Sequence, residues 1–130
     1  MVKRVKLDIK PEAFSIIGIS SHENDYRLSW SINEQLKLSL TQDNNLITGE
    51  RKEYTCFVHE DDCQTIMLVS NRCENGFLLE KYKNFDFILK FYLELNETET
   101  SEWLRNLKKV PLISAVISIP VTKMVMKLLG

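Results

Sequence analysis

Two hydrophobic periods run along this chain of 130 residues, and each predicts a different kind of element. Between residues 21 and 37, apolar side chains recur every three or four positions, which predicts an amphipathic helix over this range. Tyr26 and Trp30 share a face beside the apolar stripe, so we expect them to pack at the border of the core. The stripe itself consists of Leu28, Ile32 and Leu36.

The N-terminus of this helix carries a capping-box pattern. Glu23 follows Ser20 by three positions, so each side chain can accept a hydrogen bond from the backbone amide of the other residue. A second interpretation is open, because amides at a helix N-terminus bind anions and Ser20, Ser21 and His22 could line such a site. Helix capping alone accounts for the serines, so we rank capping above anion binding.

Alternation with a period of two predicts the strands. The clearest strand is 85–94, and 64–70 is apolar on both faces, as in a strand buried between two layers. An acidic turn at 60–62 joins 54–59 to 64–70 as a hairpin, whereas the polar segment 42–52 is expected to be a loop. The remaining strands are predicted at 4–10, 14–20, 38–41 and 113–119.

A second helix is predicted between Asn96, a good N-cap residue, and Pro111. Residues 121–130 also have helical spacing, and their apolar side chains outnumber their lysines. We expect this tail to pack on its own sheet. The open alternatives are a dimer contact and a contact with a membrane surface.

The order of these elements predicts a single domain over residues 1–130, with 121–130 as a candidate helical tail. A strand–helix–strand unit occurs twice, around a middle hairpin. Such units fold as a mostly antiparallel sheet with two helices on one face. The predicted class is therefore α+β, a ferredoxin-like or related two-layer sandwich.

Composition and charge narrow the function classes. The hydrophobic fraction is 44% and the charged fraction 27%, values typical of a globular protein. With 17 basic and 18 acidic residues the formal net charge is -1, so no global field attracts nucleic acid. No apolar run could span a bilayer, and residues 1–10 do not resemble a secretory signal. Three cysteines without framework spacing fit free thiols in a reducing cytoplasm.

The usual signatures of catalysis and metal binding are missing from the sequence. Cys56, His59 and Cys63 do not have zinc-site spacing, and Cys56 and His59 are expected on opposite faces of a strand. Neither histidine lies in a nucleophile motif, and 4 glycines leave no phosphate-binding loop. We therefore predict no metal, no cofactor and no catalytic residues.

One polar cluster could still bind a ligand. Two arginines, one at the helix N-terminus and one in the turn at 71–76, could clamp a carboxylate or a phosphate if the two segments meet. The same side chains could instead form a structural network, with Asp25 pairing an arginine, and we rank that interpretation slightly higher. The candidate ligand-binding residues are His22, Asp25, Tyr26, Arg27, Asn71 and Arg72.

Four short motifs resemble the IPExxxVDY family of small bacterial proteins, typical of the Bacteroidota. They are Ser20-Ser21-His22-Glu23, Asp25-Tyr26-Arg27-Leu28, Ser70-Asn71-Arg72 and Glu74-Asn75-Gly76-Phe77. The resemblance extends to about Leu93. The last three positions of the family signature fall on residues 85–87, where only Asp86 matches. The first three positions fall on residues 79–81, where the signature proline is absent. The resemblance implies a cytoplasmic bacterial protein without an established activity and without catalytic residues to transfer.

These observations favour a non-enzymatic module that binds another protein or its own copy, such as a homodimer. The alternative is a domain that binds, or acts on, a small anionic molecule at the N-terminus of the 21–37 helix.

Overall fold

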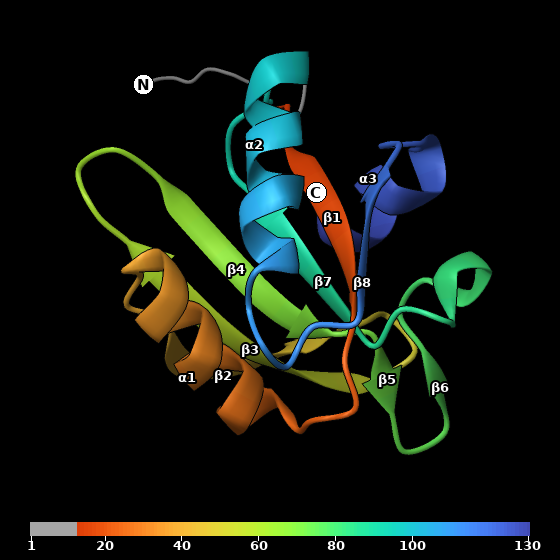
Figure 1. The fold of residues 1–130 in the computed structure, drawn as a ribbon. Coiled ribbons are helices and arrows are strands. Elements are labelled where there is room, and N and C mark those ends of the chain that lie inside the picture. The colour runs from red at the N-terminus through yellow and green to blue at the C-terminus, as the bar shows by residue number, and fades with distance from the viewer. Residues whose placement is uncertain (1–12) are drawn as a thin grey trace.

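The computed structural model describes residues 13–130, and the predicted strand over 4–10 lies outside this range. Within it, six strands form one sheet in the order β2-β3-β4-β7-β1-β8, with every neighbouring pair antiparallel (Figure 1). These strands are β1 (Ser15–Ser20), β2 (Thr41–Ile47), β3 (Glu53–Glu60), β4 (Thr65–Ser70), β7 (Phe87–Phe91) and β8 (Ala115–Ile119). A small second sheet pairs β5 (Arg72–Cys73) with β6 (Gly76–Phe77), and a short 3₁₀ helix, η2 (Glu80–Tyr82), follows.

Helices cover both faces of the large sheet. On one face, α1 (Asp25–Leu36) and α2 (Glu97–Lys108) bury Leu28, Ile32 and Leu107 against the strands. On the other face, α3 (Lys123–Leu129) buries Val125 and Leu129. This confirms the predicted α+β class, with a mostly antiparallel sheet and two helices on one face. The tail over 121–130 is helical and packs on its own core, which was the first of its three interpretations.

The central strands are apolar on both faces because both faces are covered. Ile66, Met67, Leu68 and Val69 of β4 are all buried, as predicted for a strand between two layers. The predicted hairpin is present as β3 and β4, joined by the acidic turn. The strand predicted over 85–94 is shorter, since β7 ends at Phe91.

The first helix starts later than predicted. Ser20 ends β1, and Asn24 is the N-cap, because its Oδ1 accepts a hydrogen bond from the amide of Arg27 at 2.9 Å. The capping box expected at Ser20 and Glu23 is therefore wrong. The second helix does carry a complete capping box, in which Asn96 and Glu99 accept from each other's amides.

Tyr26 and Trp30 do not border the core, contrary to the prediction. They are 69% and 63% exposed, whereas Leu28 and Ile32 are fully buried. The reason is rotational: two residues along an α-helix turn the side chain by about 200°. Trp30 is two positions from both Leu28 and Ile32, so it projects on the opposite side of α1 and not on a neighbouring face.

The segment predicted as a loop over 42–52 contains an edge strand. β2 pairs with β3, with a shift of register between Asp43 and Leu46. Its side chains are mostly exposed, so the sequence there is polar and lacks an apolar face. Residues 38–40, predicted as a strand, instead form a connection fixed by Asn33, whose side chain bonds both the amide and the carbonyl of Leu40.

Candidate functional site

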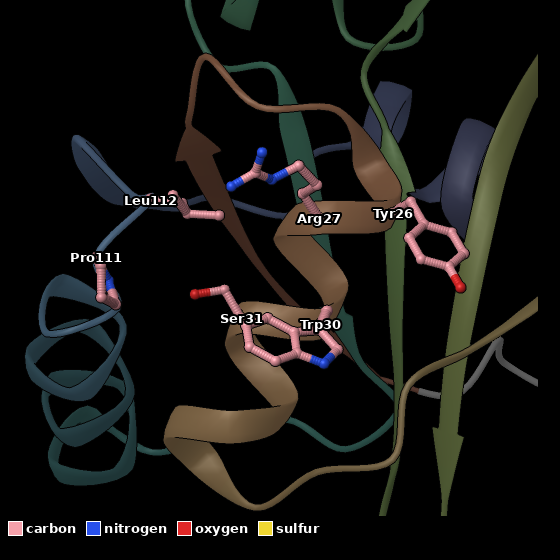
Figure 2. A pocket seen from close by; sticks show the side chains of 6 residues that line it. All are labelled: Tyr26, Arg27, Trp30, Ser31, Pro111 and Leu112. Carbon is pink, nitrogen blue, oxygen red and sulfur yellow. The ribbon is translucent and has the colours of Figure 1, made fainter.

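A groove of about 420 Å³ lies between α1 and the connection from α2 to β8. Figure 2 shows Arg27 and Ser31 pointing from α1 toward Leu112 and Pro111. Tyr26 and Trp30, one helical turn apart, are its large aromatic side chains. We call it the α1 groove. It is lined by Tyr26, Arg27, Trp30, Ser31, Pro111 and Leu112.

Buried neighbours hold both walls of the α1 groove in place. Leu28 and Ile32 anchor α1 to the sheet, which leaves Tyr26 and Trp30 on the outside of the helix. On the other wall, Val110 and Ile113 are buried, and the amide of Ile113 donates to the carbonyl of Val110 at 3.1 Å. This turn projects the side chains between them, Pro111 and Leu112, toward the groove. The exposed aromatic surface is thus backed by a packed core.

Among residues 13–130, Arg27 is the one charged side chain that lines the α1 groove. Its Nε lies 3.3 Å from Oε1 of Glu23, but the Arg27 side chain is 65% exposed. An exposed pair at this helical spacing contributes only about 0.3–0.5 kcal/mol, so it does not hold the guanidinium away from other partners. Lys108 and Lys109, just before Pro111, are also exposed. The groove therefore has an apolar lining with positive charge beside it.

Asp86 joins the loop between β1 and α1 to the segment at 71–76. Its Oδ2 accepts from the amide of Ser21 at 2.9 Å, and its Oδ1 lies 2.5 Å from Nη2 of Arg72. The Asp86 side chain is only 15% exposed. The loop before α1 and the segment at 71–76 therefore meet through a carboxylate that already pairs with Arg72.

Asn71 is a structural residue of this junction. It is 0% exposed, and its side-chain Nδ2 donates to the carbonyl oxygens of Leu79, Tyr82 and Phe85 at 3.4, 3.0 and 2.9 Å. Its Oδ1 accepts from the amide of Leu79 at 2.7 Å. The amide group thus satisfies the backbone of the loop that contains η2, and its hydrogen-bonding capacity is used internally.

The structure separates the predicted ligand-binding residues into two groups. Tyr26 and Arg27 line the α1 groove, whereas Asn71 and Arg72 belong to the Asp86 junction. His22 is exposed, and Oδ1 of Asp25 accepts from the amide of Tyr26 at 2.6 Å. In the predicted structural network Asp25 pairs an arginine. Instead, Arg27 pairs with Glu23 and Arg72 pairs with Asp86.

The Cys56, His59 and Cys63 segment does not converge on one point. Cys56 packs on the α3 side of the sheet, whereas Nδ1 of His59 accepts from the amide of Ser39 at 2.9 Å on the α1 side. The opposite orientation of these two side chains confirms the prediction. Over residues 13–130 no group of three or more His, Cys, Asp or Glu side chains is placed to hold a metal ion.

Lys90 is unusual because its ammonium group lies inside the fold. The residue is 7% exposed, and Nζ donates to the carbonyl oxygen of Leu129 at 2.5 Å. The same atom lies 4.8 Å from the ring centroid of Phe14 and 4.1 Å from that of Tyr92. Burial lowers the pKa of Lys90. Lys90 thus connects the end of α3 to the central strand β7 by a hydrogen bond.

Lys90 is expected to make stability rise with pH in the alkaline range. Its pKa in the folded state lies below the ordinary value of 10.5, so between these pKa values the unfolded chain binds more protons. The free energy of unfolding then increases with pH. In Lys90→Met that contribution is absent. Urea unfolding of both proteins from neutral pH toward the ordinary lysine pKa measures the difference, and parallel curves would contradict the assignment.

Sequence reasoning missed the α1 groove and the roles of Asp86 and Lys90. The two-residue spacing between Trp30 and the buried Leu28 and Ile32 was a usable signal for an exposed aromatic face. No local pattern links α1 to Pro111, or Asp86 to Ser21 in the distant loop between β1 and α1.

No helix within residues 13–130 has the length and apolar character that crossing a membrane requires. Comparison of the chain with protein-family models, with curated proteins and with solved structures found no match in any of the three.

Proposed function

We propose that this protein is a non-enzymatic interaction module that binds another protein through the α1 groove. The observation that carries the proposal is the exposure of Trp30 and Tyr26, 63% and 69%, one turn apart on a helix whose other side is buried. Trp, Tyr and Arg dominate the binding energy of protein interfaces, and all three occur together here. Exposed aromatic side chains backed by a rigid core lose little conformational freedom when a partner covers them.

The chemistry of the groove defines the partner. Pro111, Leu112 and the two aromatic rings favour an apolar side chain as an anchor. Of the residues that the structure describes, no carboxylate lines the groove, whereas Arg27 lines it. Lys108 and Lys109, which precede the lining residue Pro111 in the chain, are exposed. We therefore expect a short protein segment that carries an apolar anchor flanked by Asp or Glu.

Selection from a displayed library of random peptides tests this proposal. We expect the selected peptides to share an apolar residue next to acidic residues, and to bind Trp30→Ala about 30-fold more weakly, as for a hot-spot residue worth about 2 kcal/mol. Met124→Ala is the matched control, because Met124 is 60% exposed on α3, far from the groove in the fold. Peptides that bind Trp30→Ala as tightly as the wild-type protein would refute the proposal.

The alternative, a site for a small anionic molecule, has less support. Arg72 pairs with the largely buried Asp86 and Asn71 uses its side chain internally, whereas Arg27 lines the α1 groove and does not belong to that junction. Membership in the IPExxxVDY family, a bacterial origin and a cytoplasmic location are likewise proposals, and they rest on the residue motifs and the thiol content.

A further inference from the structure

The two edges of the large sheet differ in how well they are protected. Within residues 13–130, the sheet ends in β2 and in β8. β2 has Asp43 and a register shift between Asp43 and Leu46, and both a charge and an irregularity discourage further pairing. β8 pairs with β1 in an unbroken register, from Ile16↔Ile119 to Ser20↔Ala115. It carries no charge, and Ala115, Ile117 and Ser118 are exposed.

We propose that β8 pairs with β8 of a second copy of this chain, antiparallel about a two-fold axis at Ile117. The two sheets then continue into one another. This inference does not depend on the binding of a partner in the α1 groove.

The sequence of β8 is suited to pairing with itself. Ile117 would lie opposite the other Ile117, with Val116 opposite Ser118 and Ala115 opposite Ile119, so no like charges meet. Pro120 lacks an amide hydrogen and follows directly, so it limits how far the pairing could shift.

The charge distribution of α2 supports the choice of a second copy as the occupant. Among the elements, α2 makes its main contacts with β8. The proposed two-fold axis would therefore bring α2 alongside α2 of the other copy, in antiparallel orientation. The first half of α2 exposes acidic side chains and its end exposes basic ones. The acidic half of each helix would therefore face the basic half of the other. The exposed residues concerned are Glu97, Glu99, Glu102, Arg105, Lys108 and Lys109.

The mass of the full chain in solution tests the inference, measured by sedimentation velocity up to the highest soluble concentration. We expect twice the monomer mass of 15.2 kDa. In Ile117→Lys two ammonium groups would meet at the axis, so the mass is expected to fall by half. Ile117 is 39% exposed, so the variant should fold, which circular dichroism checks. Ile47→Lys is the matched control, because Ile47 is 61% exposed on β2, and its mass should stay that of a dimer.

Three further variants separate this interface from others. Arg105→Glu should weaken the dimer, and Glu102→Lys added to it should restore it, since these exposed residues near the middle of α2 belong neither to the α1 groove nor to the capping box. Trp30→Ala should remain dimeric, so failure of this inference and failure of the groove proposal are distinguishable. A monomeric full chain would overturn the inference, and so would a chain that dimerises only after residues 1–12 are deleted. A dimer that persists in Ile117→Lys, or that is lost in Ile47→Lys, would also overturn it.

Discussion

Replacing Asn71 with alanine is expected to lower the free energy of unfolding by about 3 kcal/mol, since a buried donor or acceptor left without a partner costs about 1–3 kcal/mol. The fully buried Asn71 side chain bonds the amide and carbonyl of Leu79 and the carbonyls of Tyr82 and Phe85. Alanine removes these bonds and leaves the loop around η2 without replacements. Urea unfolding, followed by circular dichroism, measures the loss.

Asn75→Ala is the matched control for this variant. Asn75 lies in the exposed turn between β5 and β6, and within residues 13–130 its side chain accepts from the Cys73 thiol alone. Its replacement should change stability by less than about 0.5 kcal/mol, as is usual for exposed positions. If Asn71→Ala were as stable as Asn75→Ala, Asn71 would not hold the loop, and its earlier assignment to a ligand site would regain support.

The second large effect concerns the orientation of α1. Leu28→Ala is expected to lower the free energy of unfolding by about 3 kcal/mol, because Leu28 is 0% exposed between α1 and the sheet and its truncation leaves a cavity. Trp30→Ala removes a larger side chain from the same helix, yet it should change stability by less than about 0.5 kcal/mol because Trp30 is exposed. Denaturant unfolding of the two variants side by side gives the comparison.

The two variants decide which face of α1 is free to bind. A loss of several kcal/mol in Trp30→Ala would mean that Trp30 packs in the core, and the α1 groove would not exist as described. Equal stability of Leu28→Ala and the wild-type protein would mean the same.

Elements whose apolar pattern matches their burial could be predicted from the sequence. β4 is buried on both faces and α2 begins with a complete capping box, and both are visible in the residue order. β2 could not be predicted, because an edge strand with exposed side chains is identified by its pairing with β3 rather than by an apolar face. The start of α1 was ambiguous, since Ser20 and Asn24 are both good caps and β1 extends through Ser20.

The candidate site was predicted only in part, for a related reason. Tyr26 and Arg27 were singled out, but the other wall of the groove, Pro111 and Leu112, comes from the connection between α2 and β8. Asp25 was expected to pair with an arginine, and Arg72 was a candidate for a ligand, whereas the partner of Arg72 is Asp86, which also accepts from the amide of Ser21. Both arrangements are set by the packing of distant elements, on which local periodicity carries no information.

The fluorescence of Trp30 tests the central claim most directly. The chain contains 2 tryptophans, and Trp103→Phe leaves Trp30 as the single reporter while keeping a ring against Phe91. We predict that a peptide with an acidic, apolar motif, taken from the selection, shifts the Trp30 emission to shorter wavelength and protects it from acrylamide quenching. If calorimetry showed the same peptide bound while Trp30 emission and quenching stayed unchanged, the α1 groove would not be the binding surface.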